Sequence, residues 1–345
     1  MEEDRNQEVP PAVLEGESHG HNNNDFNADE YNNSNNNNES SDVESVVESE
    51  EAEADRILME LSKEERNWAL AIKRADQVLL QDEDATTARC RPLTDMEYAE
   101  MALVTRGNTE EAFKRIQGLQ TFWRDYQVDH SPEQGVHYLQ ALMELQPGMI
   151  LHLDINADTN EAIRIMDYSV INPDAILAPS LSHGAEYHWK RYMNGLYYLY
   201  VASQPSLATV RAGLHEIADC EGFEWSNFSM DIERRHYDEM YQFFPVKFNN
   251  TIAYNTGSVA NLFWSLMKPV MQDQAKAGLL LGRTLDENGG DYESRRLSDI
   301  YLKPNLEEAQ QNLLRTLTTL LSMRAGYEAT FRLEGDDDPD ASIDP

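Results

Sequence analysis

Four side chains suited to acid–base chemistry stand on segments whose patterns predict β-strands. His152 and Asp154 belong to one expected strand, and His215 and Asp219 belong to another. A general acid or base must lie within hydrogen-bond reach of the proton it transfers. These four residues would form a catalytic set only if the strands brought them together, and polar residues near strand ends usually have structural partners. We therefore interpret them as structural residues and expect no catalytic residues.

The sequence also offers only incomplete matches to metal-binding, nucleophile and phosphate-binding motifs. His183 and His188 flank Glu186, but histidines five positions apart at the start of a helix do not form a zinc-binding pattern. The Gly-Ser step at residues 257–258 lacks the second glycine of a nucleophile elbow. The run LLLGRT at residues 279–284 resembles a phosphate-binding loop only superficially. We expect no bound metal, no cofactor and no enzymatic activity.

The negative charge of the chain is concentrated at its two ends. The formal net charge is −34, and residues 1–55 hold 17 acidic residues against one arginine. Residues 334–345 add six acidic residues and no basic one. Segments this rich in Asp, Glu, Asn and Ser cannot bury enough apolar surface to offset the entropy lost on ordering. Residues 1–54 and 334–345 are therefore predicted to be disordered tails.

The acidic balance argues against a nucleic-acid partner, because phosphate binding needs clustered lysine and arginine. The nearest approach to a basic cluster is Arg234, Arg235 and His236. Asp231 and Glu233 stand beside it, so a solvated helix face is the better interpretation.

Cysteine usage and hydropathy indicate a reducing, aqueous setting. Cys90 and Cys220 are the two cysteines, and nothing in the sequence marks them as a pair. The chain begins MEEDRNQEVPP, without the basic end and apolar run of a secretory signal. No stretch approaches the roughly 18 apolar residues of a membrane span. We expect a cytoplasmic protein that associates with membranes at most peripherally.

Between the tails, residues 55–147 are predicted to form a helical N-terminal lobe. Apolar residues recur there at helical spacing. Thr94 with Glu97 three positions later is a capping box that should begin the second helix. The third helix is expected over residues 110–126 and the fourth over residues 132–145.

Residues 148–333 are predicted to form an α/β core with a C-terminal helix. Strands alternating with helices favour a mixed, mainly parallel sheet covered by helices. Two strand-like runs separated by the turn cluster NADTN predict a β-hairpin. The expected strands cover residues 149–155, 161–168, 210–219, 251–255 and 279–281, and the expected helices cover residues 185–203, 226–244, 259–267 and 305–327.

Three segments of the chain carry a family resemblance. They are NTEEAFKRIQGLQTFWRDYQV at residues 108–128, AGLHEIADCEGFEWSNF at residues 212–228, and residues 243–282, which hold an aromatic-proline step and a Lys-Pro pair. In this order and spacing they resemble the core of CRAL-TRIO proteins, which enclose one apolar molecule behind a movable helix. The resemblance covers residues 56–285 and implies a carrier or sensor of hydrophobic ligands.

The chain departs from the phosphatidylinositol-transfer members of that family at their headgroup positions. Val246 stands where those members carry a glutamate, and Ala277 stands where they carry a lysine. Their small hydroxyl residues on the central strand correspond to Leu214 and Glu216. The inositol-lipid headgroup site is therefore not carried over to this chain.

A bulky helix over residues 259–267 is the candidate gate. Gly257 before it and Pro269 after it would serve as hinges, through backbone freedom and through a break in the helix. Its larger residues are expected to share one face toward an apolar cavity. The predicted pocket and gate residues are Ile217, Phe244, Ile252, Tyr254, Val259, Leu262, Phe263, Leu266, Met267 and Met271.

The sequence therefore favours a monomer that binds a hydrophobic molecule or phospholipid and carries it between membranes or presents it, meeting a membrane surface transiently. The alternative is a protein-interaction or signalling module that keeps the same fold with a collapsed pocket. An interior packed by Tyr254, Phe263 and Trp264 would favour that alternative.

Overall fold

The fold is seen in a computed structural model, in which every described residue belongs to one compact unit that begins at Ala52. The predicted tails and Met271 lie outside the described residues, which are 61–79, 90–268, 279–283 and 306–333.

Within the described residues, the N-terminal part of this unit contains α2 (Lys63–Leu79), α4 (Asp95–Thr105), α5 (Thr109–Tyr126) and α6 (Pro132–Leu145). The predicted capping box is confirmed, because the Thr94 hydroxyl accepts from the Glu97 amide and the Glu97 carboxylate accepts from the Thr94 amide at 2.8 Å. α6 begins at Pro132 behind the N-cap Ser131, as its bounds were predicted. Helix α5 is capped by Asn108, one residue earlier than expected.

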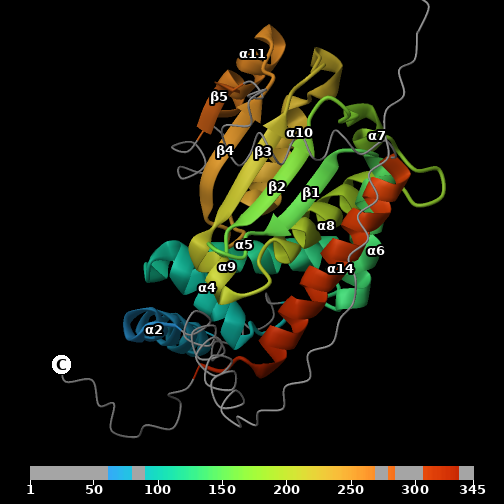
Figure 1. Cartoon of the computed structure of the whole chain (residues 1–345). Helices are drawn as coiled ribbons and strands as arrows, with labels where there is room; N and C mark the ends of the chain where they lie inside the picture. The colour runs from blue at the N-terminus through green and yellow to red at the C-terminus, as the bar shows by residue number, and fades with distance from the viewer. Residues whose placement is uncertain (1–60, 80–89, 269–278, 284–305, 334–345) are drawn as a thin grey trace, which may run out of the picture. The chain divides into compact units, whose positions relative to one another are not determined.

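A five-stranded sheet follows, in the order β1-β2-β3-β4-β5. Its strands are β1 (Ile150–Ile155), β2 (Ala162–Asp167), β3 (Leu214–Asp219), β4 (Phe248–Tyr254) and β5 (Leu279–Arg283). β1 and β2 are the predicted antiparallel hairpin, and the three remaining pairings are parallel. The mixed, mainly parallel sheet is therefore confirmed (Figure 1).

The other helical segments in the described part of the chain are α7 (Pro173–Leu177), α8 (Tyr187–Ala202), α9 (Leu207–Ala212), η1 (Trp225–Asn227), α10 (Met230–His236), η2 (Tyr237–Tyr241), α11 (Ser258–Met267) and α14 (Leu306–Thr330). In Figure 1, α11 lies at the end of the sheet near β4 and β5, away from α2 and α4 at the other end. α14 runs along α6 and β1 and also contacts α8.

The strand predicted over residues 210–219 begins later than expected, at Leu214. Ser206 caps α9 through its hydroxyl, so the residues before β3 form a helix instead of a strand. Gly213 ends that helix at φ +98°, a backbone conformation that favours glycine. A Cβ at this position would also meet the Asn249 side chain.

The helix predicted over residues 226–244 is broken into three pieces. A 3₁₀ turn, η1, comes first, and Ser229 then caps α10. The chain passes without interruption from α10 into η2, which is a π-helical turn. Such a turn carries one extra residue and changes the direction of the side chains that follow, and it is frequent at functional sites.

The two faces of the sheet belong to different apolar clusters. The large core cluster includes Met166 and Ala218 of one face, together with residues of α5, α6, α8 and α14. The other face contributes Ile165 and Ile217 to a small separate cluster. Strand side chains alternate between faces, so this division follows directly from the register.

The C-terminal helix α14 is tied to the N-terminal part of the unit by a buried ion pair. Arg324 donates through Nη2 to Glu100 Oε2 at 3.0 Å and through Nη1 to the Gln204 carbonyl oxygen at 2.7 Å. Glu100 is 1% exposed and Arg324 is 8% exposed. Among the described residues, no helix combines the length and apolar character needed to span a membrane.

Candidate functional site

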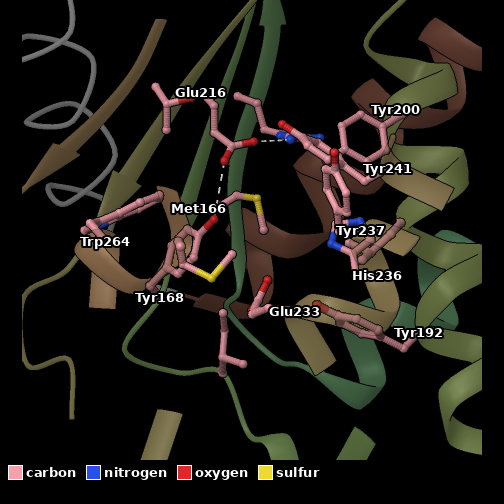
Figure 2. A pocket seen from close by; sticks show the side chains of 15 residues that line it. Met166, Tyr168, Tyr192, Tyr200, Glu216, Glu233, His236, Tyr237, Tyr241 and Trp264 are labelled. Atoms are coloured by element: carbon pink, nitrogen blue, oxygen red, sulfur yellow. Dashed lines mark hydrogen bonds and ion pairs between the residues drawn. The ribbon is translucent and has the colours of Figure 1, made fainter. Parts of the chain in front are cut away.

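A cavity of about 80 Å³ lies between the sheet and the helical segments α8, α10, η2 and α11 (Figure 2). Its walls are mainly aromatic and apolar, with a few charged side chains among them. The lining residues are Arg164, Met166, Tyr168, Ile171, Tyr192, Leu196, Tyr200, Glu216, Glu233, His236, Tyr237, Tyr241, Thr251, Trp264 and Met267.

Strand register brings the polar floor of the cavity together. Arg164 on β2 pairs with Glu216 on β3, and Glu216 pairs with Thr251 on β4. Paired residues on neighbouring strands point to the same face, so all three face the cavity. The Arg164 guanidinium forms an ion pair with the Glu216 carboxylate, and both side chains are buried.

Both carboxylate oxygens of Glu216 accept a hydrogen bond, whereas two donor nitrogens of Arg164 lack an acceptor among the described residues. The Tyr168 hydroxyl donates to Glu216 Oε1 at 3.3 Å, and Arg164 Nη2 donates to Oε2. The Arg164 Cζ lies 4.5 Å from the Tyr200 ring centroid, a cation–π contact. Arg164 Nε and Nη1 have no hydrogen-bond partner within the part of the chain that the structure describes. Although burial opposes its charge, Glu216 keeps the pKa of Arg164 above its usual range.

Two further titratable groups face the cavity from α10. Burial, together with the negative charge of Glu216, raises the pKa of Glu233 to about 7. Burial, together with the positive charge of Arg164, lowers the pKa of His236 to about 3. At neutral pH, the imidazole is therefore uncharged and the Glu233 carboxyl group is partly protonated.

Glu233→Gln should stabilise the protein at alkaline pH. The pKa of Glu233 is about 7 in the folded state against an ordinary 4.5, so the native state holds this proton more tightly than the unfolded state does. Its contribution to stability therefore falls as pH rises from 4.5 to 7 and is constant outside that window. We expect the variant to exceed the native chain by about 1–3 kcal/mol at pH 8 and to match it near pH 4.

Denaturant unfolding at several pH values measures this difference. Glu221→Gln, at an exposed carboxyl group outside any helix, is the matched control and should change stability by no more than about 0.5 kcal/mol. A constant offset for Glu233→Gln across pH would contradict the assignment.

Three of the predicted pocket residues lie on the other face of the sheet. Ile217 and Ile252 pair with each other across β3 and β4, and they pack with Tyr254 in the small cluster. The prediction that they line the cavity under α11 is wrong. Side chains alternate between the two faces along a strand, so a residue one position away from a cavity residue points to the opposite face of the sheet. Phe244 lies in the large core cluster and does not line this cavity.

The predicted face of α11 is also corrected. Met267 lines the cavity as expected, and Phe263 is buried beside it. Leu262 and Leu266 are 49% and 38% exposed, so they point outward instead. Val259 is half-buried and packs on the core, and Met271 lies outside the described residues.

The sequence pattern did not reveal the charged residues of the cavity. Arg164 and Glu216 each sit inside an apolar strand, IRIM and LHEI, where a lone charge is unusual. A lone charge inside an apolar strand is the signal that the sequence offers. Recognising that Arg164 and Glu216 pair with each other also requires the strand register. Glu233 was assigned to a solvated helix face, and the structure places it in the cavity wall.

Three of the candidate acid–base residues contact residues outside that set. His215 Nε2 lies 3.1 Å from Glu161 Oε1, and Asp219 accepts from the Asn255 amide at 3.0 Å. The backbone amide of Ile155 donates to Asp154. Across the described ranges, no group of three or more histidine, cysteine, aspartate or glutamate residues is arranged to hold a metal ion.

Comparison with known proteins does not assign a family. No family model matches the chain, and no curated protein matches it. Among solved structures, the fold is similar to the crystal structure of Sfh5, with 13% identity and a TM-score of 0.42. That match covers 65% of this chain and 82% of the other chain. The α/β fold class stated above rests on the strands and helices themselves.

Proposed function

We propose that the chain binds a hydrophobic molecule or lipid in the cavity under α11, and that it carries this ligand between membranes or presents it as a monomer. The observation that carries the proposal is an apolar helix lying over a cavity lined mainly by apolar and aromatic residues. Trp264 and Met267 project from α11 into that cavity. The order of segments that resembles CRAL-TRIO proteins supports the same function.

The size of the cavity requires α11 to move when a lipid enters. Pockets for drug-sized ligands occupy roughly 300–1,000 Å³, whereas this one measures about 80 Å³. Gly257, directly before α11, lies in open space, which suits a hinge. Leu262 and Leu266 face outward from α11. In a carrier, these two leucines would meet the membrane while the helix opens.

A second function is favoured by the same small volume. Phe263 and Trp264 are 2% and 3% exposed, so the interior under α11 is already well filled. A permanently filled interior suits a protein-interaction module that has the fold of a lipid carrier without its ligand. The two functions differ in whether the purified chain takes up lipid.

Native mass spectrometry of the full chain incubated with extracted lipids tests the proposal. We expect a stoichiometric lipid adduct on the native chain. Met166→Trp places an indole in the cavity from a rigid strand and should reduce adduct occupancy at least about tenfold. Val78→Trp places the same group on the exposed side of α2 and should leave occupancy unchanged.

Two results would count against lipid binding in this cavity. If the native chain takes up no lipid, the interaction module becomes the better account. If Met166→Trp binds as much lipid as the native chain, the ligand lies elsewhere, for example on the sheet face that carries Ile217.

A further inference from the structure

The guanidinium group of Arg164 has hydrogen-bonding capacity that its surroundings do not use. The side chain is 1% exposed and lines the cavity. Nη2 donates to Glu216, but neither Nε nor Nη1 has a partner within the described part of the chain. A buried donor without an acceptor costs about 1–3 kcal/mol, so a ligand oxygen placed there recovers that free energy.

The other cavity groups restrict the charge of the ligand. Glu216 already neutralises Arg164. Glu233 brings a second carboxyl group, and in Figure 2 it is set apart from Glu216 with Met166 between them. His236 is uncharged, and its Nε2 has no partner among the residues described. Burial raises the pKa of Tyr168, Tyr192, Tyr200 and Tyr241, so these four phenols around the cavity are uncharged.

A ligand anion would therefore enter a site whose charge is already balanced or negative. Its carboxylate or phosphate would gain one contact with Arg164 while being repelled by Glu216 and Glu233. In a poorly solvated cavity, both interactions are stronger than in water. An uncharged oxygen acceptor gains the hydrogen bond from Arg164 without that repulsion.

We propose that this cavity selects amphiphiles with an uncharged oxygen acceptor as head group, such as an alcohol, ketone or ester, over carboxylates of the same chain length. The head oxygen accepts from Arg164 Nε or Nη1, and the apolar chain lies toward Met166, Trp264 and Met267. This inference rests on the proposed function and adds the chemical class of the ligand.

A matched set of probes tests the head-group preference directly. Hexadecanol, methyl palmitate, palmitate and hexadecane share one chain and differ at the head. Their affinities for the full native chain are compared at about pH 8, where palmitate is ionised, by displacement of an apolar fluorescent probe. We expect hexadecanol and methyl palmitate to bind at least about tenfold more tightly than either palmitate or hexadecane, because a hydrogen bond to a charged donor contributes about 1.5–3 kcal/mol.

Two variants assign the preference to the ion pair. Glu216→Gln leaves the charge of Arg164 uncompensated and should reverse the order, so that palmitate binds more tightly than hexadecanol. The double variant Arg164→Met/Glu216→Met replaces both charges by apolar side chains, a change that buried pairs usually tolerate. It should bind hexadecane and hexadecanol with equal affinity. This double variant tests the proposal even if Glu216→Gln does not fold.

The outcomes separate this inference from the proposed function. If palmitate binds the native chain as tightly as hexadecanol, the head-group assignment is wrong while lipid binding stands. The head-group assignment is equally wrong if the double variant keeps the native order of affinities. If none of the four probes binds the native chain, both the head-group assignment and the proposed function fail.

Discussion

Replacing Arg324 by methionine is expected to lower the free energy of unfolding by about 3–5 kcal/mol. The change removes the counter-ion of Glu100, which is 1% exposed and would remain as an uncompensated charge in the interior. It also removes the hydrogen bond to the Gln204 carbonyl oxygen. A loss of this size should lower Tm by about 6–20 °C, as judged from the scaling for domains of 150–250 residues. Thermal and denaturant unfolding followed by circular dichroism measure it.

Two comparisons show whether the unpaired charge causes the loss. Arg315 lies on the same helix and is exposed, so Arg315→Met should change stability by no more than about 0.5 kcal/mol. The double variant Glu100→Met/Arg324→Met removes both charges and should recover most of the lost stability. If the double variant is as unstable as Arg324→Met alone, lost packing and not the buried carboxylate is responsible.

Phe263→Ala is expected to accelerate ligand exchange by about 10²–10³-fold. The Phe263 ring lies 4.9 Å from the ring of Phe228, 5.1 Å from Phe223 and 5.9 Å from Tyr168, measured between centroids. Removing a buried phenylalanine costs about 3–5 kcal/mol. If α11 opens as a unit, this cost lowers the free energy of opening, and each 1.4 kcal/mol changes the open population tenfold.

Hydrogen exchange separates local opening from global loss of stability. In Phe263→Ala, the amides of α11 should exchange about 10²–10³-fold faster, while those of β3 keep most of their protection. Leu262→Ala, one position away on the exposed side, should leave both unchanged. Equal loss of protection in α11 and β3 would show that the helix does not open independently.

Local rules identified most of the elements in this chain. The bounds of α6 follow from Ser131 and Pro132, whose types suit an N-cap and a first helical position. The capping box at Thr94 and the turn between β1 and β2 are equally local signals. The start of β3 was misjudged because Val210 favours a strand, whereas the cap at Ser206 and the bend at Gly213 make its segment helical.

The site was less predictable because it depends on choices between equally periodic patterns. In α11, the stripe through Leu262 and Leu266 is as apolar as the stripe through Ala260 and Trp264, and the structure buries the second. A helix that is apolar on both sides gives no local reason to prefer either face. Ile217 and its neighbours pose the same choice on the sheet, which is buried on both faces.

The distance along the chain between Glu100 and Arg324 has a consequence for biosynthesis. The two residues are separated by 224 positions, which a ribosome adding about 5–20 residues per second needs roughly 10–45 s to supply. Over that interval, the nascent α4 lacks the partner that neutralises its inward carboxylate. Completion of the fold therefore waits until residue 324 has been synthesised, and a chain interrupted before that point would keep the Glu100 carboxylate without its partner.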